Sequence, residues 1–299
     1  MTLSYETVDV FTETAFGGNP LAVVTGGETL TTEAMQAIAR EFNTPETTFV
    51  MPPADPANTA RVRIFTPAME LPFAGHPNVG TATMLARRGE VFGRPVGDAV
   101  RFEEKIGLVG LDILRSGGEA VGAVLTSPAM PEVKERFDPS AVAAAVGLPD
   151  TAIVVARHAP VQVAIGAVLL IAEVEDRDVL AAARGDAGLQ LKHLGEAAPP
   201  LVYLYTREDA GADYLHIRSR MFAPRAGIPE DPATGGAAVA IAGLFATLMD
   251  GSLDLVIDQG IEMGRPSRLD VRLIREGGAE RITVAGRCVP MMRGEIVAV

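Results

Sequence analysis

The sequence contains a single cysteine, Cys288, among its 299 residues. One thiol cannot build an intramolecular disulfide framework. The chain also lacks an N-terminal basic segment followed by an apolar run, which is the pattern of a secretory leader. These two absences together predict a cytoplasmic protein, in which Cys288 is a buried, small, apolar residue.

Positive charge and long apolar runs are also scarce. There are 26 Lys and Arg residues against 38 Asp and Glu residues, so the formal net charge is −12 and the pI is near 4.9. An acidic surface disfavours nucleic acid and anionic membranes as partners. The most apolar run covers residues 233–249, slightly short of the roughly 20 residues that a membrane-spanning helix needs. It is apolar on every side, so we expect it to form a helix surrounded by protein.

The sequence lacks the common motifs of metal, thiol and dinucleotide sites. No metal site is predicted, because the four histidines lie far apart in the sequence and none belongs to an H-x-x-x-H or C-x-x-C pattern. Cys288 has no catalytic motif around it, and no G-x-G-x-x-G connects a strand to a helix. With metal, thiol and dinucleotide chemistry not indicated, the sequence predicts acid–base catalysis without a cofactor.

One motif is present twice, in residues 75–82 and 230–237. In each copy a titratable side chain, His76 or Asp231, directly precedes a proline that opens a run of small residues. Because proline is favoured at the first helical position, each proline is expected to begin a helix with unpaired backbone N–H groups. Such helix ends attract anions. The pattern predicts a site that holds a carboxylate-bearing substrate and moves protons on it.

The repetition extends upstream of both motifs. Residues 63–67 resemble 220–224, and the helix-like stretch leading into residues 43–50 resembles the one leading into 147–154. Three ordered matches argue for two similar halves. This alignment makes Asp150 the counterpart of Glu46, although Asp150 is interpreted as a structural turn residue. It also predicts an insertion between residues 154 and 220 of the second half, where no pattern is readable.

Strand and turn patterns surround the two predicted helices. Alternating polarity at residues 60–65, 214–218 and 268–273 predicts half-buried strands. Pairs of glycine favour antiparallel hairpins over a parallel sheet. Two surface helices are expected near residues 32–42 and 139–146. The predicted fold is α+β, with two halves that each wrap a curved, mostly antiparallel sheet around one buried helix.

Two domains of ordinary size suit this length. The first is expected to cover residues 1–127, joined by a last strand at about 288–299, and the second to cover residues 128–287.

Five motifs, taken in order, resemble the phenazine-biosynthesis isomerase-like (PhzF-like) family, and together they cover nearly the whole chain. They are residues 16–23, 45–50, 72–77, 230–235 and 260–267. The resemblance implies the fold of diaminopimelate epimerase and proline racemase, with two pseudo-symmetric barrel-like halves around central helices and the active site in the cleft between them. It also implies a homodimer and a small-molecule carboxylate substrate. Those racemases use two cysteines near the helix ends, and this chain has none there, which excludes a two-thiol racemisation.

The resemblance also implies roles for individual residues. Glu46 matches the general base and acid of the family, and His76 and Asp231 match its other polar catalytic residues. The substrate-binding positions that it implies are Asn19, Gly75, Asn78, Val79, Gly235 and Gly236. Backbone N–H groups at the two helix starts would hold the carboxylate or stabilise an enolate-like intermediate. Gly236 departs from the family pattern, which usually has serine there, and this puts the prototypical phenazine-precursor substrate in doubt.

Each assignment has a structural alternative. Glu46 would otherwise be a surface acid capping a turn, His76 a helix-cap residue, and Asp231 an N-cap. Arg265 is interpreted as a strand-edge ion-pair partner. The leading hypothesis is a cofactor-independent isomerase that uses Glu46. The alternatives are an epimerase or lyase that uses the same base, and a small-acid-binding protein without turnover.

Overall fold

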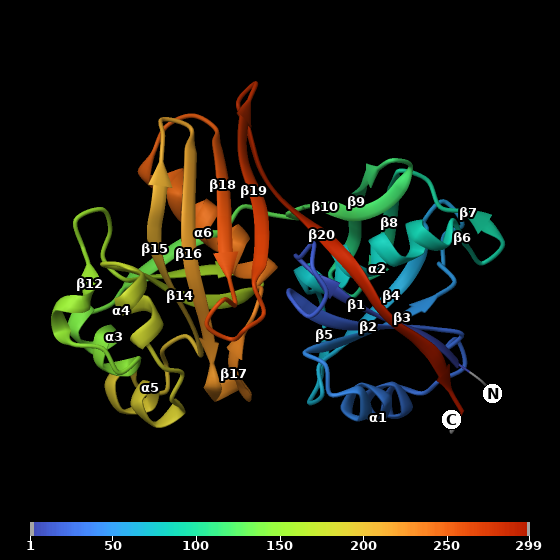
Figure 1. Ribbon diagram of the computed structural model, residues 1–299, viewed down its shortest axis with the longest axis horizontal. Helices are drawn as coiled ribbons and strands as arrows, with labels where there is room; N and C mark the ends of the chain where they lie inside the picture. Colours follow the sequence, from blue (N-terminus) through green and yellow to red (C-terminus); the bar gives the residue numbers. More distant parts are fainter. Residues whose placement is uncertain (1–2, 298–299) are drawn as a thin grey trace. The chain divides into compact units, whose positions relative to one another are not determined.

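The computed structural model describes residues 3–297 (Figure 1), and the chain divides into two compact units. The first unit comprises Met1–Pro128 and Ala285–Val299, and the second comprises Ala129–Val284. The expected divisions were after residues 127 and 287. Each unit is a mixture of strands and helices in which the strands pair mostly antiparallel, so the predicted α+β class is confirmed.

The first unit is a closed barrel of strands. In order around the barrel they are β1 (Leu3–Val10), β2 (Asn19–Thr25), β3 (Glu46–Met51), β4 (Ala60–Phe65), β8 (Ala99–Glu104), β9 (Gly107–Ser116), β10 (Glu119–Thr126) and the later part of β20 (Ala279–Ile296). The pairs β2–β3 and β4–β8 are parallel. Strand β20 pairs with both β10 and β1 and thereby closes the barrel. The short strand β5 (Glu70–Leu71) pairs with β4. Strands β6 (Glu90–Val91) and β7 (Arg94–Pro95) form a separate two-stranded sheet.

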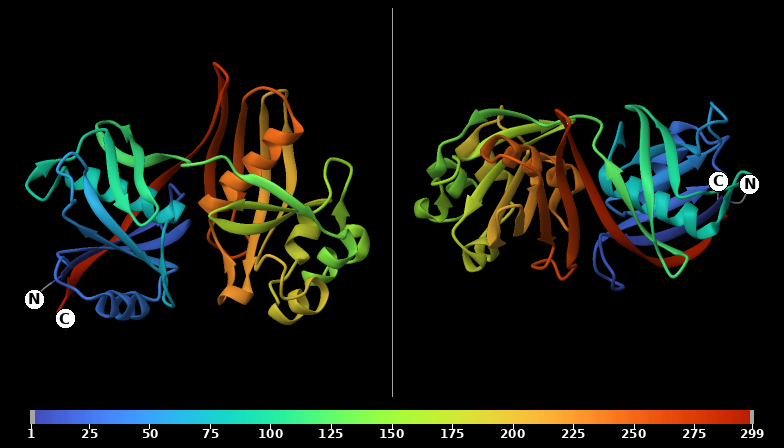
Figure 2. Two further views of the ribbon diagram at one scale, coloured as in Figure 1. Left: turned by 180° about the vertical axis from the view of Figure 1, so that it is seen from behind. Right: turned by 90° about the horizontal axis from the view of Figure 1, so that it is seen from above.

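Helix α2 (Gly75–Arg88) fills this barrel (Figure 2) and is buried from Gly75 to Ala86. Gly80 lets it lie close to the strands, because a Cβ there would come within 2.6 Å of Leu21 and 2.8 Å of Val10. Helix α1 (Thr32–Phe42) lies outside the barrel, as predicted. It begins at Thr31, whose side chain accepts the Ala34 N–H, and it ends at a left-handed Asn43.

The second unit wraps a sheet around α6 (Gly235–Leu248). The strands of this sheet are β11 (Glu132–Arg136), β13 (Val161–Ile165), β14 (Ala167–Val174), β15 (Leu201–Ala210), β16 (Tyr214–Ala223), β18 (Leu253–Gln259), β19 (Ser267–Glu276) and the first part of β20. The pairs β14–β15 and β16–β18 are parallel. The remaining elements are β12 (Ile153–Val154), β17 (Ile228–Asp231), α3 (Pro139–Ala145), α4 (Arg177–Ala182), α5 (Ala187–Leu194) and two 3₁₀ turns, Asp150–Ala152 and Pro224–Ala226. The predicted all-round burial of α6 is confirmed over most of its length.

Glycine pairs form two tight hairpins. Gly117 and Gly118, between β9 and β10, have φ values of 58° and 88°, and Gly277 and Gly278, between β19 and β20, have 59° and 80°. A two-residue hairpin that follows the twist of its strands needs positive φ at both positions, which glycine adopts without strain. The hairpins predicted from these pairs are confirmed.

The two units repeat one topology. The series β1, β2, β3, β4, β5, α2, β8, β9 has the same order and pairing directions as β13, β14, β15, β16, β17, α6, β18, β19. Side-chain contacts repeat as well. Arg63 lies over the Phe65 ring and pairs with Glu70, and Arg220 lies over the Phe222 ring and pairs with Glu230. The prediction of two similar halves is therefore confirmed.

One of the three predicted matches is wrong. The counterpart of β3 is β15, since Leu21 faces Glu46 in one parallel pair and Leu169 faces Leu201 in the other. Leu201 and not Asp150 therefore corresponds to Glu46. The predicted insertion is wrong too, because the step to the matching arginine is 17 residues (63 − 46) in one half and 19 (220 − 201) in the other. A short helix followed by proline and threonine is a common pattern and matched by chance.

The helix starts also differ from the prediction. Helix α2 begins at Gly75 after an extended Ala74, so Pro77 is its third residue, and α6 begins at Gly235, after Pro232. Proline is tolerated at the third position because its missing N–H would have no partner in the first turn. His76 therefore lies inside the first turn of α2, whereas Asp231 is the last residue of β17.

None of the helices in residues 3–297 is long and apolar enough to cross a membrane.

Candidate functional site

Glu46 and His76 lie together in the first unit. The Glu46 Oε2 atom is 3.1 Å from the His76 Nε2 atom, and the two side chains are 12% and 6% exposed. Glu46 is the first residue of β3, and His76 is in the first turn of α2. The family resemblance places both residues in a catalytic group, and the structure brings this pair into contact.

The backbone at Glu46 is held from its own loop. Thr44 Oγ1 donates a hydrogen bond of 2.8 Å to the Glu46 carbonyl oxygen. From Thr47 onward β3 is buried. Two residues after Glu46, the hydroxyl of Thr48 lies 2.9 Å from that of Thr81 in α2. Strand β3, which contains Glu46, and helix α2, which contains His76, are therefore joined by a buried polar contact.

Burial keeps the His76 imidazole neutral, because removal from water disfavours the charged form. It lowers the pKa of His76 to about 3. A neutral imidazole can donate from one ring nitrogen and accept at the other. The Glu46–His76 pair therefore carries at most one charge at neutral pH, and His76 acts in it as a neutral hydrogen-bonding group.

The start of α2 is anchored by an ion pair in the preceding hairpin. The Arg63 guanidinium donates two hydrogen bonds to the Glu70 carboxylate, at 2.8 and 2.7 Å, and Lys105 Nζ lies 2.7 Å from the same group. Glu70 belongs to β5, directly before the loop that leads into α2. These contacts fix the direction in which the chain enters the helix.

The predicted binding positions in α2 are all buried. Asn78 is fully buried, and its Nδ2 donates a 3.0 Å hydrogen bond to the Ala74 carbonyl oxygen. Val79 is fully buried as well, and its carbonyl oxygen accepts a bond from Thr83. Gly75 is the first helical residue, so its N–H and that of His76 have no acceptor within the helix. This turn can contribute backbone N–H groups to an anion, whereas the Asn78 side chain braces the turn from inside.

In the second unit, Asp231 belongs to a compact polar group. Thr234, the N-cap of α6, donates its hydroxyl to the Asp231 carboxylate. The Gln259 Nε2 atom donates to the Asp231 carbonyl oxygen at 2.8 Å and to the Thr234 hydroxyl at 3.1 Å. The preceding residue, Glu230, is bound by Arg220 through two 2.8 Å hydrogen bonds. Asp231 is therefore held between a paired strand and the start of a buried helix.

Gly235 and Gly236 are the first two residues of α6, where backbone N–H groups have no acceptor within the helix. A Cβ added at Gly236 meets no atom within 4 Å. The space that a serine side chain would fill is therefore open. The departure from the family pattern at this position removes a hydroxyl without any rearrangement around it.

Asn19 is the fully buried first residue of β2. The turn before it needs glycine, because Gly18 has a φ of +64° and a Cβ there would lie 2.3 Å from the Val10 carbonyl oxygen.

Arg265 lies in the turn before β19, where its N–H donates to the Gly260 carbonyl oxygen at 3.0 Å.

The structure brings Glu46, His76 and the first turn of α2 together in one unit, and Asp231 and the first turn of α6 together in the other. That both groups meet one substrate stays a prediction. Sequence analysis missed Gln259, although it directly precedes the fifth family motif.

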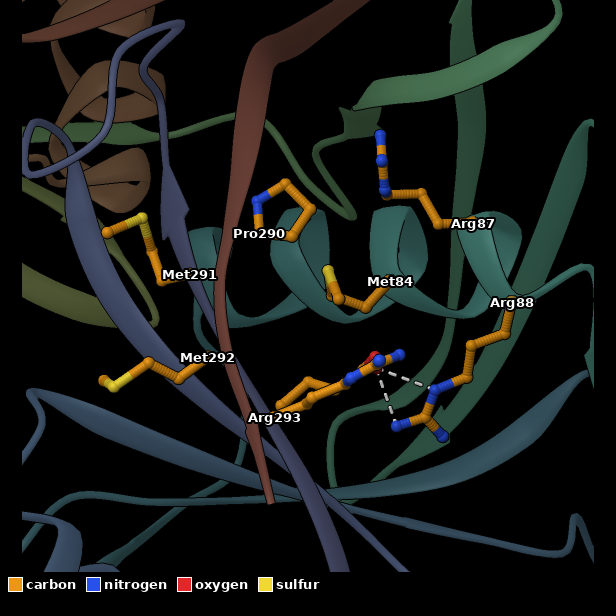
Figure 3. Close-up of a pocket in the computed structure, with 8 residues that line it drawn as sticks. Met84, Arg87, Arg88, Pro290, Met291, Met292 and Arg293 are labelled. Atoms are coloured by element: carbon orange, nitrogen blue, oxygen red, sulfur yellow. Dashed lines mark hydrogen bonds and ion pairs between the residues drawn. The ribbon is translucent and has the colours of Figure 1, made fainter.

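A pocket of about 450 Å³ lies at the other end of α2 (Figure 3). Its lining consists of Glu6, Met84, Arg87, Arg88, Pro290, Met291, Met292 and Arg293. Arg88 is paired with Glu6 at 2.7 Å and Arg87 donates to the Ala120 carbonyl oxygen. This pocket is distinct from the Glu46–His76 pair, which lies at the N-terminal end of the helix.

Cys288 is buried, as predicted, and Thr83 donates to its sulfur. Burial raises the pKa of its thiol to about 12, so at neutral pH it is protonated and a poor nucleophile.

Comparison with known proteins gives one consistent result. The family model described as "Phenazine biosynthesis-like protein" matches residues 8–294. An uncharacterised isomerase of Mesorhizobium japonicum is 38% identical, with 99% of each chain covered. The trans-2,3-dihydro-3-hydroxyanthranilate isomerase of Pseudomonas aeruginosa is 35% identical, over 93% of this chain and 92% of that protein.

Among solved structures, a phenazine biosynthesis protein of the PhzF family from Bacillus anthracis superimposes with a TM-score of 0.84 over 99% of each chain. At 24% sequence identity, this likeness concerns the fold. It confirms the architecture expected from the five motifs.

Proposed function

The chain is an isomerase of the phenazine biosynthesis-like protein family, and we propose that it moves a proton on a small carboxylate substrate with Glu46 as general acid and base. The 3.1 Å contact between Glu46 and His76 carries this proposal. It puts a carboxylate and a neutral imidazole side by side, next to a helix end that can bind an anion.

In the proposed reaction, the ionised Glu46 carboxylate removes a proton from a carbon that the substrate's π-system acidifies. The electron pair left on that carbon delocalises along the π-system. Protonated Glu46 then returns the proton to a different carbon of the same system, and the double bond moves. Atoms and charge balance within the substrate, and no external oxidant or reductant is consumed.

His76 supports this cycle as a neutral group. Its imidazole N–H can donate to the Glu46 carboxylate and so orient it toward the substrate. Because the pKa of His76 is lowered to about 3, no imidazolium competes for the proton. The N–H groups of Gly75 and His76 are the proposed partners of the substrate carboxylate.

We further propose that Asp231, Asn19 and the N–H groups of Gly235 and Gly236 contact other parts of the same substrate. The support is the repeated topology, which gives α6, like α2, first-turn N–H groups that have no acceptor within the helix. The ionised carboxylate of Asp231 would accept a hydrogen bond from an amine or hydroxyl of the substrate.

The first substrate to test is trans-2,3-dihydro-3-hydroxyanthranilate, the compound that names the Pseudomonas aeruginosa relative. It is small and carries a carboxylate, an amine and a hydroxyl. Gly236 offers no hydroxyl to such a substrate, so a related carboxylate that needs one contact fewer belongs in the same panel.

Deuterium incorporation tests the reaction directly. The panel is incubated in deuterated water with wild type, Glu46→Gln and the control Glu41→Gln, an exposed carboxyl of α1. We expect wild type and the control to incorporate deuterium at the new carbon, and Glu46→Gln to lose about 100-fold or more of the rate. Mass spectrometry and proton NMR locate the label.

Four other results would point elsewhere. Equal exchange by Glu46→Gln removes Glu46 from its role. Exchange at one stereocentre without movement of a double bond indicates an epimerase, and loss of water indicates a lyase. Binding without exchange throughout the panel favours a small-acid-binding protein. The homodimer implied by the resemblance stays a prediction, which light scattering after size exclusion tests.

A further inference from the structure

The pocket at the C-terminal end of α2 plays no part in the proposed reaction. Its volume of about 450 Å³ is in the range of sites that bind small molecules. Met84 of α2 and Pro290 of β20 contribute apolar surface to it (Figure 3). Met84 follows His76 by eight residues (84 − 76) in the same helix, which corresponds to about 12 Å along the helix axis. The pocket is therefore a separate site from the Glu46–His76 pair.

Strand β20 has a bulge where it lines this pocket. Its register against β1 shifts by one residue there, because Val8 pairs with Pro290 but Thr7 pairs with Met292. Met291 is therefore an extra residue without a partner on β1. Side chains alternate between the two faces of a strand, and one extra residue reverses that alternation for all residues that follow.

The bulge turns Arg293 toward the inside of the barrel. In register, Arg293 lies opposite Glu6, and Gly294 lies opposite Tyr5. The outward face is that of Tyr5, whose ring packs against Phe42 of the outer helix α1, and a Cβ at Gly294 would lie 2.8 Å from the Tyr5 ring. Arg293 and Glu6 therefore face inward. Without the bulge, Arg293 would lie opposite Tyr5 and face outward.

The pocket contains more positive than negative charge. Three arginines and one glutamate line it, although the chain as a whole has a net charge of −12. The glutamate, Glu6, is occupied by Arg88, whose Nε and Nη2 atoms each lie 2.7 Å from Glu6 Oε2. Within residues 3–297, the Arg293 side chain has neither an ion pair nor a hydrogen bond. It extends toward Arg88 from the opposite side of the pocket (Figure 3).

The ordinary role of arginine at a helix end explains two of the three. Arg87 and Arg88 are the last residues of α2, where positive charge complements the helix dipole. Arg87 also donates to the Ala120 carbonyl oxygen at 3.0 Å and lies 3.6 Å from the exposed Glu119 carboxylate. Arg293 belongs to a strand, so the helix dipole does not explain it. Its inward direction needs a bulge and gives it no partner within the described chain.

We propose that this pocket binds a small aromatic carboxylate and that Arg293 is the main partner of the carboxylate group. A guanidinium presents two parallel N–H donors that match the two oxygens of a carboxylate. Met84 and Pro290 provide the apolar surface for the ring, and the sulfur of methionine makes favourable contacts with aromatic rings. Because Glu6 already neutralises Arg88, a bound anion would compensate the charge that Arg293 leaves in the pocket.

Methyl NMR on the full chain tests the proposal through Met84. Methionine methyl groups are labelled with carbon-13, the Met84 signal is assigned with Met84→Leu, and benzoate is titrated in. For wild type we expect the Met84 signal to shift with a dissociation constant of about 10 mM or below. The signal of Met249, at the end of α6, should stay in place.

Two variants test the role of Arg293. In Arg293→Gln the dissociation constant for benzoate should rise about five- to tenfold, because a charged hydrogen-bond donor is lost. Arg281→Gln, which changes an exposed arginine of the same strand, is the control and should bind benzoate like wild type. Equal binding by wild type and Arg293→Gln would overturn the assignment of the carboxylate to Arg293.

Three further probes test the chemistry of the ligand. Benzamide keeps the ring without the charge, and acetate keeps the charge without the ring, so both should bind more weakly than benzoate. Inorganic phosphate would use the arginines alone. A Met84 shift with phosphate or acetate as large as that with benzoate, at equal concentration, would show a general anion site and overturn the aromatic ligand.

The wild-type titration is decisive by itself if Arg293→Gln fails to fold. A Met84 signal that stays in place throughout the benzoate titration overturns the proposal. So does a Met84 signal that moves when the protein is diluted without ligand, since a second copy of the chain would then cover the pocket. None of these readouts uses the isomerase reaction, so the outcome is independent of Glu46.

Discussion

At the residue scale, the site combines groups that the sequence marks clearly with groups that only the fold brings near them. Glu46 and His76 belong to recognisable motifs, and their contact follows from β3 and α2 lying side by side. Gln259 belongs to none of these motifs. Its contacts with Asp231 and Thr234 depend on the end of β18 lying beside the start of α6, and that placement depends on sheet register, which alternating polarity does not specify between distant strands.

The buried imidazole of His76 predicts a specific acid sensitivity. In the folded protein the pKa of His76 is about 3, below the ordinary value of 6.5. Below pH 6.5 His76 therefore binds a proton in the unfolded chain but stays neutral in the folded one. Stability should therefore fall with pH, by about 1.4 kcal/mol per unit from this group. His76→Asn should flatten the fall between pH 6 and pH 4 when unfolding by urea is measured.

The control is His193→Asn, at the partly exposed end of α5, which should keep the wild-type slope. An unchanged slope in His76→Asn would show that the imidazole is protonated in the folded protein.

At the element scale, strong local signals predicted the structure well. The predicted ranges of α1 and β4 agree with the observed ones, because Thr31 caps the helix and β4 alternates between buried and more exposed residues. Helices α4 and α5 were missed, even though Asp176 and Asp186 cap them. They have six and eight residues, which is too short for a periodic pattern to stand out. The predicted helix starts were wrong because the preference for proline at the first position is weaker than the geometry of the entering loop.

The repeated Arg–Glu pair predicts matched effects in the two halves. Lysine in place of Arg63 or Arg220 keeps the charge but loses the two-bond contact and the stacking on phenylalanine. We expect about 1–3 kcal/mol of destabilisation for Arg63→Lys, and more for Arg220→Lys, since their side chains are 22% and 9% exposed. Arg268→Lys, in an exposed pair, is the control and should unfold like wild type in guanidinium. The reverse ranking would contradict the argument from burial.

At the scale of the whole molecule, composition and pattern predicted the class, the pairs of motifs and the two halves. They did not predict which segments correspond. The topology makes β15 the counterpart of β3 in the second half. This correspondence depends on the parallel pairs β2–β3 and β14–β15, whose strands are far apart in sequence. Non-local pairing of this kind leaves no mark in a local window, so one chance match produced both a false counterpart and a false insertion.

Closure of the first barrel depends on the place where β10 meets β20. A Cβ at Gly122 would lie 2.2 Å from the Gly286 carbonyl oxygen, and backbone cannot move aside as a side chain can. Gly122→Ala should therefore destabilise the protein by about 1–3 kcal/mol. Gly110→Ala in β9, where a Cβ meets nothing within 4 Å, should leave Tm nearly unchanged or raise it. Similar Tm values for the two variants would argue against close contact at the closure.

Strand β20 also gives the chain an order of assembly. The second unit is one continuous segment, Ala129–Val284, whereas the first unit needs both Met1–Pro128 and Ala285–Val299. During synthesis the N-terminal half therefore leaves the ribosome with an open barrel edge until β20 has been made, although N-terminal domains generally fold first. The later-made unit is the first to have its complete sequence, and the half that carries Glu46 and His76 is finished only once β20 joins it.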